Sequence, residues 1–74
     1  MKLPQISGFE LIKILNKFGF VLLRQKGSHV RLEKIDNGKI IKITVPMHNR
    51  LKKGTLSSII KESKINEEEF SRYL

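Results

Sequence analysis

The chain has 74 residues with 15 lysines and arginines against 7 acidic residues, which gives a formal net charge of +8, and it contains no cysteine. A chain of this length has room for one small domain, and the lack of cysteine excludes a disulfide framework and a thiolate metal site. Two histidines are too few for the usual zinc ligand sets, and no apolar run approaches the ~18 residues of a membrane helix. We therefore expect one soluble, cytoplasmic domain over residues 1–74 that holds no metal and binds no membrane.

The first predicted element is a helix over residues 8–18. Ser7 and Glu10 have the spacing of a capping box, in which each side chain hydrogen-bonds the backbone of the other residue. Gly19 follows at the position where a left-handed residue ends many helices. Between these signals the apolar residues recur at the spacing of one helix face: Leu11, Ile14, Leu15 and Phe18. We expect the leucines, isoleucines and phenylalanines of this helix and of the helix after the strands to be core residues.

The next segment, residues 20–25, is predicted to be a strand. It is apolar on both of its alternating faces, so the register of the strand stays ambiguous. Lys26, Gly27 and Ser28 then form a turn, in which glycine supplies backbone angles that other residues avoid.

A hairpin follows this turn. Residues 29–34 alternate between apolar and polar side chains, as a half-buried strand does. Asp36-Asn37-Gly38 is a strong hairpin signal, and residues 40–45 form the third strand, which Pro46 ends. The apolar faces of these two strands consist of Val30, Leu32, Ile41, Ile43 and Val45.

The last third of the chain is predicted to be helical after a polar, basic loop over residues 47–53. Apolar residues at helical spacing predict a helix over roughly residues 54–63. Asn66 and Glu69 form a second capping pattern and predict a short terminal helix. The side chains that would pack this last turn against the protein are Phe70 and either Tyr73 or Leu74.

Together these elements predict an α+β fold in the order α-β-β-β-α, followed by the short terminal helix. Three consecutive strands should form an antiparallel meander, and because they have one clearly apolar side, the helices must all cover that side. The other face of the sheet then stays open. It carries His29, Arg31, Lys42 and Thr44.

The positive charge is concentrated in the middle of the chain. Residues 24–53 carry nine cations against two carboxylates, a net charge of +7, whereas residues 1–23 and 54–74 carry +2 and −1. A basic surface that is gathered in this way favours a polyanion as partner, and RNA is the candidate. The alternative is a surface that serves only solubility.

His29 is the candidate catalytic residue. An imidazole exchanges protons near neutral pH, so His29 can abstract the proton of an RNA 2′-hydroxyl. The resulting alkoxide would attack the adjacent phosphorus, while lysine or arginine stabilises the charge on the phosphate oxygens. This chemistry requires no metal. The alternative is that His29 is a plain surface residue.

The residues around His29 are candidates for RNA contacts. Gly27 could let a phosphate approach the backbone, and Ser28 could donate a hydrogen bond to phosphate or to His29, although a turn alone explains both residues. His48, in the basic loop, could transfer a second proton, could bind phosphate as an imidazolium, or is an ordinary loop residue. The side chains expected to contact phosphates are Arg24, Lys26, Arg31 and Lys42.

Several motifs occur in an order that resembles a known family. They are Ser7-Gly8, Gly19-Phe20, Arg24-Gln25-Lys26-Gly27-Ser28-His29, Val45-Pro46-Met47-His48 and Leu51-Lys52-Lys53-Gly54-Thr55-Leu56. Together they resemble the HicA (YcfA-like) family, the toxins of HicA–HicB toxin–antitoxin systems, from about residue 5 to residue 70. Each motif is weak by itself, and their combination is specific.

The resemblance implies a fold like that of a double-stranded-RNA-binding domain (dsRBD) and a metal-independent endoribonuclease, an mRNA interferase, that arrests growth. It places the family's essential histidine on His29 and its turn glycine on Gly27, and it implies no cofactor. The implied protein partner is a HicB antitoxin whose covering surface is acidic. Two positions depart from the family pattern, because Lys53 stands where proline is common and Val30 where a polar residue is common.

Two functions of other classes stay open. A non-catalytic RNA-binding module of the same fold needs only the basic surface and recognition of RNA shape. A pure interaction protein would bind an acidic protein and no nucleic acid. Replacement of His29 by alanine separates the enzyme from the binding module, since the module would be unaffected.

Overall fold

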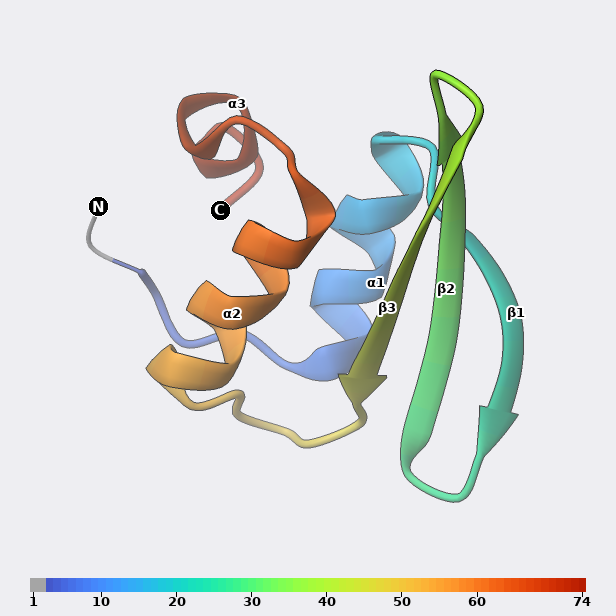
Figure 1. The fold of residues 1–74 in the computed structure, drawn as a ribbon. Coiled ribbons are helices and arrows are strands. Elements are labelled where there is room, and N and C mark those ends of the chain that lie inside the picture. The colour runs from blue at the N-terminus through green and yellow to red at the C-terminus, as the bar shows by residue number, and fades with distance from the viewer. Residues whose placement is uncertain (1–2) are drawn as a thin grey trace.

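The computed structural model describes residues 3–74, and its elements follow the predicted order (Figure 1). They are α1 (Gly8–Lys17), β1 (Val21–Lys26), β2 (His29–Asp36), β3 (Lys39–Pro46), α2 (Lys53–Ser63) and α3 (Glu67–Ser71). This order and the antiparallel sheet confirm the predicted α+β class and are consistent with a dsRBD-like fold. The predicted boundaries differ from the observed ones by one or two residues, which is ordinary for the ends of elements.

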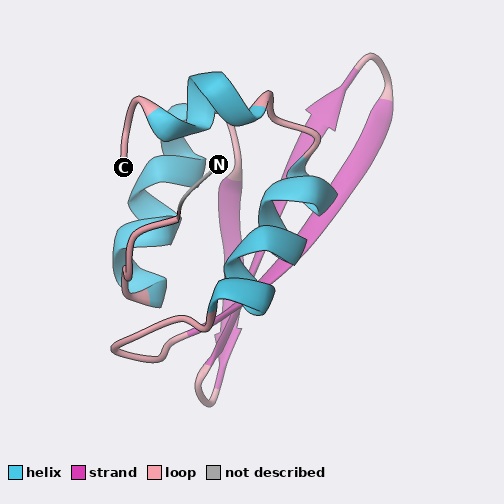
Figure 2. Cartoon of the chain, turned by 90° about the vertical axis from the view of Figure 1, so that its left-hand side faces the viewer, coloured by secondary structure: helices cyan, strands magenta, loops and turns pink. Residues whose placement is uncertain are grey.

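The three strands form one antiparallel sheet in the order β1-β2-β3, so β2 is central and the other two strands are edges. Figures 1 and 2 show α1 and α2 on the same side of this sheet, as predicted. The apolar faces of β2 and β3 point toward them, although Ile41 is only half-buried. The largest fully buried side chains of the shared core are Leu11, Leu15, Phe20, Leu32, Ile43, Leu56 and Phe70.

Both ends of α1 carry the signals that the sequence predicted. The Ser7 hydroxyl accepts from the Glu10 N–H at 3.0 Å, and the Glu10 carboxylate accepts from the Ser7 N–H at 3.2 Å. At the other end Gly19 has a φ of 94°, and the Phe20 N–H donates to the Leu15 carbonyl at 3.1 Å. This Schellman-type ending directs Phe20 into the core, where it is 2% exposed, and it is why β1 begins one residue later than predicted.

The hairpin between β2 and β3 has the predicted turn. Asn37 and Gly38 have φ values of 51° and 79° and join the paired residues Asp36 and Lys39. Positive φ at both central positions is the mark of a type I′ turn, whose twist matches that of the strands it joins.

Two expectations about burial were wrong. Phe9, expected in the core, is 57% exposed, because it lies on the outer side of α1, where the Lys13 ammonium sits 4.7 Å from its ring centroid. The loop before α2, expected to be a polar, basic loop, contains Leu51, which is 4% exposed and anchors the loop in the core.

The C-terminal helix α3 is fixed to α1 by aromatic contacts. Asn66 caps it by accepting from the N–H groups of Glu68 and Glu69 at 2.8 and 3.3 Å. The Phe70 ring stacks on Phe18 with 6.1 Å between centroids. Tyr73 meets Phe18 edge-on, and Leu74 is half-buried against the core, so both of the alternatives for packing this last turn occur.

Candidate nucleic-acid interface

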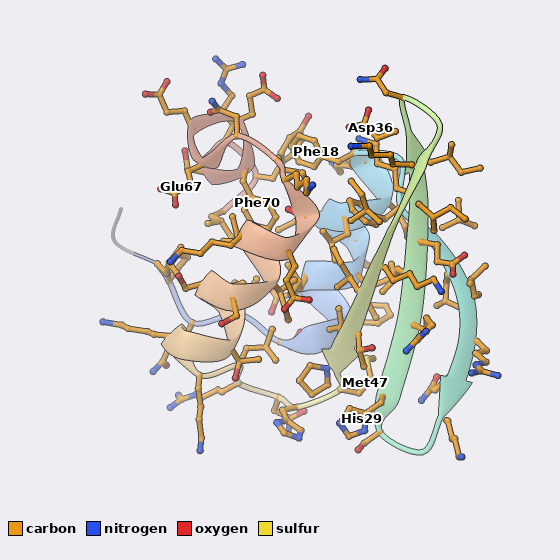
Figure 3. The ribbon with its side chains drawn as sticks, in the orientation of Figure 1. Phe18, His29, Asp36, Met47, Glu67 and Phe70 are labelled. Atoms are coloured by element: carbon orange, nitrogen blue, oxygen red, sulfur yellow. The ribbon has the colours of Figure 1, made fainter. Side chains whose placement is uncertain are left out.

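His29 is exposed at the first position of β2, next to a tight turn. Gly27 has a φ of 60° and Ser28 does not have a positive φ, which is the pattern of a type II′ hairpin turn. The Gln25 side-chain amide donates to the Gly27 carbonyl at 3.0 Å and holds the turn from the β1 side. The imidazole therefore projects from a short, well-defined turn at one end of the sheet (Figure 3).

The strand register places three cations beside His29 on the open face. Lys26 pairs with His29, and Arg24 pairs with Arg31 in the next row. Thr44 on β3 lies opposite Arg31. Paired residues of neighbouring strands project from the same face of a sheet. Together these five residues line a hollow in the open face: Arg24, Lys26, His29, Arg31 and Thr44.

A β-bulge in β1 decides which side chains reach this hollow. Leu22 pairs with the buried Leu32, and the register shifts before Arg24 pairs with Arg31. In an unbroken ladder, two residues further along β1 would again point toward the core, which would put Arg24 on that side. The extra residue, Leu23, turns Arg24 and then Lys26 onto the open face, as bulges do beside many functional sites.

Lys42 lies on the open face but outside the hollow. It pairs with Glu33, whose other neighbour is Val21, so this row is one step further from His29 than the row of Arg31. A carboxylate thus stands directly opposite Lys42, whereas no carboxylate lines the hollow around His29.

His48 is exposed in the loop after β3, and three hydrogen bonds tie this loop to other segments. The Met47 N–H donates to the Ser28 carbonyl at 2.6 Å, next to His29. The Gly8 N–H donates to the His48 carbonyl at 3.0 Å, and further along the loop the Leu51 N–H donates to the Ile6 carbonyl at 2.8 Å. The two histidine-bearing segments therefore meet at the same end of the molecule, and Figure 3 shows His29 beside Met47 there.

Gly8, which belongs to the Ser7-Gly8 motif, is a positioning residue whose packing role the sequence did not predict. It is buried in the first turn of α1, and a Cβ atom there would collide with the Pro46 carbonyl oxygen and lie 3.1 Å from the Met47 Cα. The approach of α1 to this loop therefore requires glycine. The sequence held only one signal, a glycine placed directly after an N-cap serine.

A second hollow beside the first is lined by Lys52 before α2 and by residues of α2 from Gly54 to Glu62. Thr44 borders both hollows, and Lys52 and Thr55 line the second one. Thr44 was predicted on the open face, but its place at the border of two hollows depends on how α2 packs beside β3, which no local pattern shows.

The His29 imidazole makes no hydrogen bond to another group within residues 3–74, so its nitrogen atoms are free to meet a substrate. In the same part of the chain, no three histidine or carboxylate side chains are grouped closely enough to hold a metal ion. No helix among the described residues is long and apolar enough to cross a membrane.

A family model described as the HicA toxin of bacterial toxin-antitoxin systems matches residues 8–65, which is well over half of the chain. The matched range contains both histidines and every residue of the hollow around His29. A search of curated proteins finds no match.

Proposed function

The chain belongs to the HicA toxin family of bacterial toxin–antitoxin systems, and from this premise we propose that it is an endoribonuclease that cleaves messenger RNA without a metal ion. One observation carries the proposal. The imidazole of His29 is exposed beside Arg24, Lys26 and Arg31, in a hollow that no carboxylate lines. Such a site attracts a phosphodiester and puts a proton acceptor next to it.

The reaction needs only these groups. With a phosphate in the hollow, His29 takes the proton of the neighbouring ribose 2′-hydroxyl, and the 2′-oxygen attacks the phosphorus. The negative charge that develops on the phosphate oxygens is stabilised by the guanidinium and ammonium groups around it. The bond to the 5′-oxygen breaks, and this oxygen takes up a proton from solvent. The products end in a 2′,3′-cyclic phosphate and a 5′-hydroxyl.

The remaining proposed RNA contacts lie on both sides of His29 and extend the RNA-binding surface beyond the hollow. Lys42 would contact the RNA backbone further along the sheet, where Glu33 reduces the local positive charge. At the other end the turn offers the Gly27 backbone and the Ser28 hydroxyl, and His48 stands on the adjoining loop. We assign these residues to binding, since each would contact RNA on either side of the phosphate that reacts.

The proposal includes a protein partner. A HicB-like antitoxin with an acidic surface would cover the basic face and keep the toxin inactive. Because messenger RNA and its translation lie in the cytoplasm, we place the activity there. One contiguous apolar core joins α1, the sheet, α2 and Phe70 of α3, which supports treating residues 1–74 as one functional domain.

The test is cleavage of a long RNA in EDTA by the wild-type chain and by His29→Ala. We expect wild type to cleave and the variant to lose at least about 100-fold in rate, the usual contribution of general acid–base catalysis. Because the His29 imidazole is exposed and makes no hydrogen bond within residues 3–74, the variant should keep the wild-type circular dichroism spectrum and melting temperature. Analysis of the product ends should show 5′-hydroxyls.

His48→Ala is the matched control, since it removes an exposed imidazole from the adjoining loop. A smaller loss than that of His29→Ala assigns His48 to binding, and an equal loss would make it a second proton-transfer group. Equal cleavage by wild type and His29→Ala would refute the catalytic role.

A non-catalytic RNA-binding module is the second candidate. The observation that favours it is that no carboxylate of residues 3–74 hydrogen-bonds the His29 imidazole, whereas catalytic histidines often have such a partner. If wild type binds RNA in a salt-dependent way but does not cleave it, this second function holds.

A further inference from the structure

The open face of the sheet has an apolar end that the proposed chemistry does not use. Ile35 and Ile40 pair directly across β2 and β3 and are 75% and 59% exposed. Val21, on the same face of β1, is 61% exposed. We call these three residues the distal patch. It lies next to the hairpin at Asp36, which Figure 3 shows at the opposite end of the sheet from His29.

The edge strand β1 enlarges this apolar surface. Leu22 and Leu23 are 47% and 52% exposed and follow Val21 directly. All six residues of β1 are exposed, and the strand has a pairing partner on one side only. An exposed apolar edge strand is a ready site for association with another chain, and proteins normally protect such edges.

The other large exposed apolar side chains within residues 3–74 are Phe9 and Tyr73, and each is partly covered. The Lys13 ammonium stands 4.7 Å from the Phe9 ring centroid, and the Lys17 ammonium stands 4.9 Å from that of Tyr73. The other five large exposed apolar side chains within residues 3–74 are aliphatic, and all of them belong to the distal patch or to the adjoining residues of β1. This gathered apolar surface is therefore the part of the described chain that favours a partner.

The charge around the patch determines what kind of partner fits. The same face continues from the patch into the hollow with Arg24 and Arg31, so a chain that covers both must bring apolar side chains to one end and carboxylates to the other. A second copy of this protein does not fit, because each copy carries a net charge of +8. RNA does not fit either, since isoleucine and valine offer neither hydrogen bonds to its bases nor charge to its phosphates.

We propose that the distal patch is the docking surface of the antitoxin, an acidic protein whose apolar side chains cover Ile35 and Ile40 while its carboxylates occupy the hollow around His29. The patch would hold the antitoxin on the toxin, and the carboxylates would exclude the phosphodiester. Both parts rest on the antitoxin partner of the proposed function, and the inhibition rests on the proposed RNA cleavage as well. RNA and the antitoxin would then both bind at the hollow, whereas only the antitoxin would bind at the distal patch.

The test uses Ile35→Thr, Ile40→Thr and the double variant, because threonine keeps the β-branched shape that suits a strand but removes apolar surface. Each variant is titrated calorimetrically with the antitoxin of the same toxin–antitoxin pair, purified as a separate chain. We expect the double variant to bind the antitoxin about tenfold or more weakly, which corresponds to about 1.4 kcal/mol or more. Its cleavage of RNA and its melting temperature should match wild type.

Phe9→Gln is the control, since Phe9 is as exposed as Ile40 but lies on α1, away from the sheet face. It should leave antitoxin affinity unchanged. Arg31→Gln should weaken the binding of both RNA and antitoxin, because the hollow serves both partners.

Three results would overturn the proposal. The first is that the double variant binds the antitoxin as tightly as wild type does. The second is that the antitoxin does not bind the wild-type chain at all. The third is that sedimentation shows a dimer for the wild-type chain and a monomer for the double variant. A failure of the proposed function is distinguishable from these. It would appear as a wild-type chain that cleaves no RNA and yet binds the antitoxin through Ile35 and Ile40.

Discussion

Replacement of Gly8 by alanine tests how the two histidine-bearing segments are held together. The added Cβ would collide with the Pro46 carbonyl oxygen, and that oxygen belongs to the backbone and cannot rotate aside. Either the start of α1 or the segment 46–48 must move, and overpacking of this kind costs about 1–3 kcal/mol. The hydrogen bond from the Gly8 N–H to His48 would weaken as well, at a cost of about 1 kcal/mol.

Alanine also favours a helix over glycine by about 1 kcal/mol, which offsets part of this cost. The net expectation for Gly8→Ala is a loss of about 1–3 kcal/mol in the free energy of unfolding. In a domain of this size each kcal/mol corresponds to a fall of roughly 4–8 °C in melting temperature. Because the strain falls between Pro46, which pairs with His29, and His48, RNA cleavage should also fall at temperatures where the variant is folded.

Gly54→Ala is the matched control. Gly54 lies in the first turn of α2, has no positive φ and would have no heavy atom within 4 Å of an added Cβ. This variant should be neutral or gain up to about 1 kcal/mol from helix propensity. Thermal denaturation followed by circular dichroism measures both. A Gly8→Ala chain that melts at or above the wild-type temperature would refute the argument from close approach.

Two further predictions concern the end of the chain and the sheet face. Asn66→Ala removes the side chain that accepts from the N–H groups of Glu68 and Glu69, so urea denaturation should show a loss of about 1 kcal/mol in the free energy of unfolding. An unchanged denaturation midpoint would mean that α3 adds nothing to stability. Arg31→Gln and Lys42→Gln should each weaken RNA binding and reduce the slope of log K against log salt by about 0.7 for single-stranded RNA. A slope that stays at the wild-type value would show that the replaced residue does not contact a phosphate.

The sequence predicted those parts of the fold that depend on neighbours along the chain. The capping box of Ser7 and Glu10, the positive φ of Gly19 and the hairpin at Asp36-Asn37-Gly38 are all local, and each was found where it was expected. The alternation of β2 also placed His29 and Arg31 on one face correctly, because the side-chain period of a strand is two.

What escaped prediction depends on segments that are distant along the chain. The apolar run of β1 was compatible with burial on either face, and nothing in it shows that the strand lies at an edge and stays exposed. Leu51 lies in a segment with lysines and arginine on both sides, and only the packing of α2 against the sheet explains why it is buried. Gly8 has a requirement that arises from a loop almost forty residues later.

The bulge in β1 is a local feature with consequences for the whole open face of the sheet. If Leu23 were paired in an unbroken ladder, the register that begins at Val21 would turn Arg24 toward the core, where burial of an unpaired guanidinium is costly. With the bulge, Arg24 and Lys26 join His29 on the open face, while Leu23 itself is left exposed beside the distal patch. The bulge that accommodates Leu23 therefore keeps Arg24 and Lys26 in the phosphate hollow, and Leu23 itself lengthens the apolar edge. This explains why the basic and the apolar surfaces lie side by side on the same strand, where a single partner can cover both.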